Sequence, residues 1–165
     1  MGKVRYYIIA VLFAFYFVGI PEELYTGDGT AMLVYPFFHA NAFHLAVNCL
    51  SVWAVFDPRT RPEWWYLPVG YIIAAATYLV TDYVMVGFSC VLFAVAGLRT
   101  PSFRSRWWRS WNAWVYLGTM LLMFFLPMFA AGAHLTAFAT GVVVACVVRF
   151  QRKLAYDTRR AKGGK

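Results

Sequence analysis

Charged residues are scarce in this sequence: they make up 13% of its 165 residues, whereas 62% are hydrophobic. A soluble domain carries about 25% charged residues, so the composition excludes an ordinary soluble domain. The apolar residues form long blocks with the charges between them, the pattern of an integral membrane protein. The net charge of +8 would favour nucleic-acid binding in a soluble protein. Here we attribute it to membrane topology, and we expect no nucleic-acid partner.

Cysteine is also rare, with only Cys49, Cys90 and Cys146 in the chain. Each of them lies inside an apolar block. An odd number of cysteines placed in this way is not a disulfide framework. We expect the three side chains to pack as small hydrophobic groups.

A cleavage site is missing from the first apolar block, Val4 to Ile20, which only Arg5 interrupts. A signal peptide would end in small residues of the Ala-x-Ala kind, whereas this block ends at Val18, Gly19 and Ile20 before Pro21. We therefore predict a retained first helix rather than a removed leader.

The remaining apolar blocks predict five more helices, which makes an all-α bundle of six transmembrane helices. We expect the second from Met32 to Phe56, the third from Trp64 to near Asp82, the fourth from Gly87 to Leu98, the fifth from Trp111 to about Pro127, and the sixth from Ala131 to Val148. Residues 1–150 then form one membrane domain, and residues 151–165 form a basic cytoplasmic tail that we expect to fray.

Positive charge is absent from three of the links between these helices. All 15 Lys and Arg fall at the N-terminus, in the second and fourth links, and in the tail. The opposite links carry Glu22, Glu23, Asp28 and Asp82. Because Lys and Arg accumulate on the cytoplasmic side of a membrane, we predict that both termini are cytoplasmic.

Four polar side chains lie inside the predicted spans at overlapping depths: Ser89, His134, His44 and Asn48. Polar residues at this depth are functional candidates by default. A rise of about 1.5 Å per residue places all four in the middle to outer part of the bilayer. We expect them to line one cavity that opens to the outside, with irregular, water-bordered backbone at 83–86.

Ser89 and His134 carry the chemistry of this cavity. Small residues follow each of them at helical spacing (Cys90, Ala94 and Gly97; Ala137, Gly141 and Ala145), which lets two membrane helices approach closely. An imidazole within hydrogen-bond reach of a hydroxyl takes its proton and makes it a nucleophile. Both the helix N-terminus and its dipole favour a developing oxyanion at Ser89.

Together these features resemble the rhomboid family of intramembrane serine proteases, in compact six-helix members of bacterial type. The resemblance rests on three motifs: His39-x4-His44-x3-Asn48, Gly87-x-Ser89, and His134 seven residues before Gly141. It covers roughly Val4 to Val148. It implies a multi-pass protein of a bacterial plasma membrane whose substrates are transmembrane helices of other proteins, with no metal or cofactor.

The resemblance also implies a role for each site residue. Ser89 is the nucleophile and His134 the general base, and no acidic third member is present. The oxyanion hole consists of His44, Asn48 and the backbone N–H of Ser89. The supporting positions are Gly87, Gly141, His39 near the mouth of the site, and Phe93, which stands where the family has a tyrosine packed on the histidine. The chain departs from the family at Cys90 and Ala137, where glycine is usual, and in its short first external link.

Other interpretations of these residues stay open at this point. His44 and Asn48 are also typical of interhelical hydrogen bonding in a purely structural bundle. A metal site from His39, His44 and His134 is disfavoured because the first two lie about 140° apart on a helix and no carboxylate shares their depth. Cys90 is an alternative nucleophile beside Ser89. The alternative function is a catalytically inactive rhomboid-like protein that binds transmembrane helices. The sequence does not predict an oligomeric state, but it predicts that the basic tail contacts anionic lipids.

Overall fold

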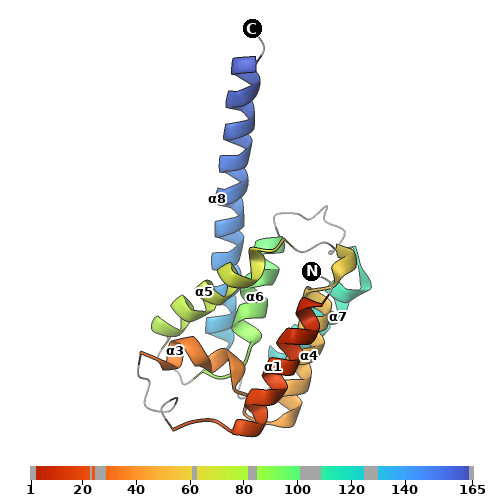
Figure 1. Cartoon of the computed structure of the whole chain (residues 1–165), viewed down its shortest axis with the longest axis vertical. Helices are drawn as coiled ribbons and strands as arrows, with labels where there is room; N and C mark the ends of the chain where they lie inside the picture. The colour runs from red at the N-terminus through yellow and green to blue at the C-terminus, as the bar shows by residue number, and fades with distance from the viewer. Residues whose placement is uncertain are drawn as a thin grey trace.

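The computed structural model describes residues 3–22, 24, 29–60, 63–81, 85–100, 109–124 and 130–163. Within these residues every regular element is helical (Figure 1). The α-helices are α1 (Val4–Val18), α3 (Ala31–Val34), α4 (Ala42–Val55), α5 (Tyr66–Leu79), α6 (Ser89–Arg99), α7 (Trp111–Phe124) and α8 (Ala131–Gly163). Two short 3₁₀ turns, η1 (Tyr35–Phe37) and η2 (Pro58–Thr60), flank α4.

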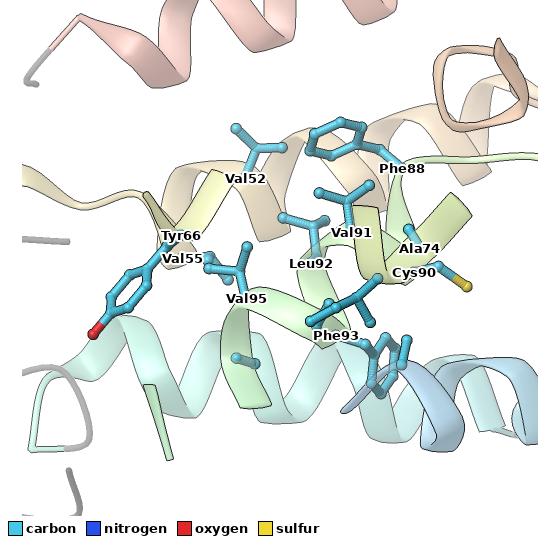
Figure 2. Packing of buried hydrophobic residues seen from close by; sticks show 14 of the residues in the cluster. Val52, Val55, Tyr66, Ala74, Phe88, Cys90, Val91, Leu92, Phe93 and Val95 are labelled. Carbon is cyan, nitrogen blue, oxygen red and sulfur yellow. The ribbon is translucent and has the colours of Figure 1, made fainter. Parts of the chain in front are cut away.

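Helix α6 is the centre of the bundle, because all its residues from Ser89 to Arg99 are buried. It packs most extensively against α8 and α5, and it also contacts α4 and η1. A helix that is apolar all round belongs in the interior of a bundle. Figure 2 shows side chains of α6 pointing to several sides of the helix into the hydrophobic core.

The predicted second helix is interrupted in the structure. Residues 31–55 form α3, η1 and α4, with an extended break between η1 and α4. Pro36 lies in η1, and proline removes a helical hydrogen bond and crowds the preceding turn. Asn41 then starts α4 as its N-cap, because its side chain accepts a hydrogen bond of 2.8 Å from the N–H of His44. The prediction of one continuous helix from Met32 to Phe56 is therefore wrong.

Helix α8 continues past the predicted end at Val148 and reaches Gly163 without interruption. The segment expected to fray is helical because it contains no Gly or Pro between Val142 and Lys162 and is rich in Ala, Leu, Lys and Arg. In Figure 1 this extension projects well beyond the rest of the bundle. The predicted boundary at residue 150 thus falls inside one helix.

The extension of α8 is held where it leaves the bundle. Arg152 forms a 3.2 Å ion pair with Glu63, which lies just before α5. Trp65 donates an indole hydrogen bond to the same carboxylate, and the Arg152 guanidinium lies 6.0 Å from the centre of the Trp65 ring. These contacts of Glu63, Trp65 and Arg152, which we call the clip, join the link before α5 to α8.

Among the described residues, α8 is the one helix long and apolar enough to cross a bilayer by itself. Helices α1, α5 and α6 are apolar but have 15, 14 and 11 residues, fewer than the roughly 20 that span the hydrocarbon core. Some of the residues used in the sequence predictions lie outside the described part of the chain: residues 83–84 and Pro127, with the acidic residues Glu23, Asp28 and Asp82.

Candidate functional site: a serine–histidine pair between α6 and α8

Ser89 is the first residue of α6 and is 3% exposed. The first N–H groups of an α-helix have no partner within the helix. Phe88 occupies the N-cap position and makes no side-chain cap. The N-terminus of α6 therefore offers hydrogen-bond donors beside the Ser89 hydroxyl.

His134 lies in the first turn of α8 and contacts Ser89. The distance between His134 Nε2 and Ser89 Oγ is 2.7 Å, and the distance between His134 Nδ1 and the carbonyl oxygen of Ala130 is also 2.7 Å. A carbonyl oxygen only accepts hydrogen bonds, so Nδ1 carries the proton. In the neutral ring Nε2 then has its lone pair free, and it accepts the hydrogen bond from the Ser89 hydroxyl. The contact expected from the sequence is present.

Two glycines bring α6 and α8 together behind this pair. A Cβ added to Gly97 would lie 2.2 Å from the carbonyl oxygen of Phe138, and one added to Gly141 would lie 2.3 Å from that of Ala94. The backbones thus touch where the side chains are absent, as in close helix pairs of membrane proteins. Ala137, one turn after His134, is fully buried and fits the same contact.

Phe93 holds the other side of the imidazole. It lies one turn after Ser89 on α6, and its ring centroid is 4.7 Å from that of His134. Tyr116 of α7 lies behind it, with ring centroids 6.2 Å apart. The phenyl ring therefore makes the contact with the histidine that the resemblance implied for this position.

Gly87 adopts a backbone conformation that only glycine tolerates well, with φ of +104°. Its N–H donates to the carbonyl oxygen of Tyr35 at 3.1 Å. A Cβ at this position would lie 2.5 Å from Cε1 and 2.6 Å from Nε2 of His44, and 3.6 Å from Nδ2 of Asn48. Glycine at position 87 is thus what lets both side chains of α4 approach the start of α6.

Asn48 is buried, with 1% of its surface exposed. Its Nδ2 donates a 2.9 Å hydrogen bond to the carbonyl oxygen of His44, one turn earlier. An amide nitrogen has two hydrogens, so a second one can face the site. Its Oδ1 has no hydrogen-bond partner within the described structure. Ser51, on the same stripe, points elsewhere and contacts the Thr119 hydroxyl of α7 at 3.2 Å.

His39 lies in the break before α4 rather than on the helix that carries His44, so the angle of 140° expected between them does not apply. Its Nδ1 donates to the carbonyl oxygen of Phe37 at 3.2 Å, and its ring stands edge-to-face to His44 with centroids 5.2 Å apart. Within the described residues no group of three His, Cys, Asp or Glu gathers as metal ligands. His39 therefore packs beside His44 and restricts the position of that ring.

The Cys90 side chain is buried in the hydrophobic core, with 1% of its surface exposed. In Figure 2 Cys90 and Phe93 project from different sides of α6. The Cys90 thiol thus packs in the core, whereas the Ser89 hydroxyl contacts His134 Nε2.

Sequence reasoning missed two backbone carbonyls that organise this site, those of Ala130 and Tyr35. The first fixes the tautomer of His134, and the second holds Gly87. A carbonyl group is present at every residue, so no side-chain pattern reveals these two. The sequence analysis also missed the aromatic ring of Tyr116, which lies behind Phe93.

Comparison with known proteins gives one match. The family model described as "Rhomboid domain" matches residues 22–151. This range includes every site residue described above. No curated protein and no solved structure matches the chain.

Proposed function

The chain belongs to the rhomboid family, and from this premise we propose that it is an intramembrane serine protease acting through Ser89 and His134. The rhomboid domain makes it an integral membrane protein of a family that consists of intramembrane proteases and inactive relatives. The observation that carries the proposal is the 2.7 Å contact between Ser89 Oγ and His134 Nε2 in a buried site. A serine that has only a packing role does not need such a base.

The proposed reaction starts when Ser89 Oγ attacks the carbonyl carbon of a peptide bond and passes its proton to His134 Nε2. The imidazolium that forms keeps its Nδ1–H on the Ala130 carbonyl. That carbonyl takes the orienting position that an aspartate has in a triad, without its charge. His134 then gives the proton to the leaving amine, and water hydrolyses the acyl-enzyme in a second cycle through the same base.

The proposed oxyanion hole consists of the Ser89 backbone N–H, Asn48 and His44. The uncapped start of α6 supports the first donor. The second N–H of the Asn48 amide and the approach of both α4 side chains to Gly87 support the other two. Donors fixed in place before charge develops are the largest single source of stabilisation in many acyl-transfer enzymes.

We propose that six segments cross the membrane, those built around α1, α4, α5, α6, α7 and α8, with both termini in the cytoplasm and the site opening to the exterior. The one-sided distribution of Lys and Arg supports this orientation. Contacts in the structure agree with it: Arg5 at the start of α1 lies 3.6 Å from the centre of the Trp53 ring near the end of α4. The basic end of α8 faces the same side, where it would meet anionic lipids.

Substrates of the proposed protease are transmembrane segments of other proteins, cut near their outer ends. The test is a reporter whose transmembrane segment carries Gly and Pro near its external end, reconstituted in liposomes with the protein. We expect one cleavage product with the wild type and none with Ser89→Ala or His134→Ala. The Cys90→Ala variant is the matched control and keeps cleavage. An uncut reporter that the wild type and Ser89→Ala bind equally would favour the inactive, helix-binding alternative.

A further inference from the structure

An open apolar groove of about 540 Å³ runs between α1 and α5, and neither Ser89 nor His134 lines it. Val4, Ile8 and Val11 line it from α1, Leu67 and Ile72 line it from α5, and Phe88 lies among its lining residues. Helix α1 packs on α4 and η1, whereas α5 packs on α6 and α8. The two helices that border the groove therefore pack on different neighbours, and a space remains between them.

The lining of the groove selects its occupant. The groove is open along one flank, and only aliphatic and aromatic side chains and Pro68 line it. An apolar groove on the flank of a membrane protein is surrounded by the hydrocarbon chains of lipids.

We propose that this groove binds one acyl chain of an anionic phospholipid, with its head group at Lys3. Lys3 is exposed and directly precedes Val4, the residue that lines the groove at the start of α1. Arg5 turns to the other side, onto Trp53. In the proposed topology Lys3 lies at the cytoplasmic surface, where anionic lipids attract basic residues.

The bound chain reaches the back of the catalytic helix. Phe88 is 3% exposed and precedes Ser89 at the start of α6. Figure 2 shows Phe88 and Phe93 on opposite sides of α6, so the groove and the His134 contact flank the same turn. An acyl chain in the groove fills the space behind Phe88 and restricts the movement of the turn that begins at Gly87.

The experiment measures lipid retention and needs no activity. Protein is extracted from bilayers of equal parts phosphatidylglycerol and phosphatidylcholine, and its retained lipids are counted by native mass spectrometry. We expect one retained phosphatidylglycerol per wild-type chain. Ile72→Trp should lower its retention roughly tenfold, because Ile72 is 65% exposed and an indole there fills the groove without disturbing the core. Lys3→Gln should keep a retained lipid but remove the preference for phosphatidylglycerol.

The matched control is Val143→Trp, which adds the same indole at a residue 61% exposed on α8. It should retain lipid as the wild type does. Wild-type protein without a retained lipid overturns the proposal, and so does an equal loss in Val143→Trp. A dimer that disappears in Ile72→Trp would overturn it in favour of a second copy of the chain. Leu67→Trp repeats the test from the other end of the α5 lining, and none of these outcomes depends on Ser89 being catalytic.

Discussion

Gly141 of α8 lies so close to Ala94 of α6 that a methyl group on its α-carbon would stand 2.3 Å from the Ala94 carbonyl oxygen. A backbone carbonyl cannot swing away as a side chain can, so Gly141→Ala must push the two helices apart. We expect it to lower the free energy of unfolding by about 1–3 kcal/mol and to reduce proteolytic turnover, because Ser89 and His134 lie on the separated helices. Denaturation in micelles and reporter cleavage measure the two effects.

Gly132→Ala is the matched control for Gly141→Ala on the same helix. A Cβ at Gly132 meets nothing within 4 Å, and Ala is a better helix former than Gly by about 1 kcal/mol. Gly132→Ala should therefore leave stability unchanged or raise it slightly. Equal losses in both variants would contradict the helix-contact explanation.

Gly87→Ala tests the approach of His44 to the start of α6. The Cβ of the new alanine would lie 2.5 Å from the His44 ring. The alanine would also have to adopt a φ of +104°, which strains any residue other than glycine. We expect stability to fall by about 1–3 kcal/mol and turnover to fall by roughly 10² or more, because an oxyanion donor is displaced.

Gly19→Ala separates the two effects in Gly87→Ala. Gly19 also has a positive φ, +82°, but a Cβ there meets nothing within 4 Å. The Gly19→Ala variant should lose stability through backbone strain, but each folded molecule should cleave the reporter as fast as the wild type does. If Gly87→Ala and Gly19→Ala lost turnover alike, His44 would have no special position at the site.

Asn48→Ala should lower turnover by about 10²–10³ with little effect on folding. Its Nδ2 bonds only to a carbonyl of its own helix, and its Oδ1 has no partner within the described residues, so little stability is lost with the amide. Ser51→Ala is the control on the same face of α4. It removes the link to Thr119, so it should cost about 1 kcal/mol and spare turnover. An Asn48→Ala protein that fails to fold would make Asn48 a structural residue instead.

The clip between Glu63 and Arg152 should open in acid. Burial alone would raise the pKa of Glu63, but hydrogen bonds from Trp65 and Arg152 and the charge of Arg152 outweigh it and lower the pKa below the ordinary value of 4.5. A carboxylate whose pKa is lower in the folded state contributes stability above its unfolded pKa, and that contribution disappears as the pH falls through the folded pKa.

A spin label at Tyr156 measures the opening of this clip. We expect the α8 extension to gain mobility as the pH falls below 4.5, and Glu63→Gln to show the same mobility already at pH 7. The pair is exposed and contributes at most about 1 kcal/mol, so the melting temperature should hardly change. A label whose mobility is independent of both pH and Glu63→Gln would show that the clip does not hold the extension.

The sequence predicted the contacts that depend on the size and polarity of side chains. The small residues after Ser89 and His134 predicted the close contact of two helices, and Gly97 and Gly141 make it. Pro36 marks the break before α4, but the apolar residues on both sides of it are equally typical of one continuous membrane helix. The sequence did not predict that α8 continues to Gly163. A basic, polar segment is typical of both a frayed tail and an exposed helix.

The sequence could not predict contacts made by backbone atoms. The tautomer of His134 depends on the Ala130 carbonyl, which stands four residues earlier in the chain and has no side-chain signature. Likewise His39 was assigned to a helix face, and only the break after η1 turns its ring against His44. These are effects of tertiary structure that override local pattern.

Reaction of Ser89 with a fluorophosphonate tests the central claim most directly, because it requires an activated hydroxyl and no knowledge of the substrate. The protein is labelled in lipid, and the modified residue and its rate of modification are identified by peptide mass spectrometry. We predict covalent modification of Ser89 in the wild type and in Cys90→Ala, and none in Ser89→Ala or His134→Ala. An unmodified wild-type Ser89, or a rate that His134→Ala leaves unchanged, would contradict the assignment of these two residues as nucleophile and base.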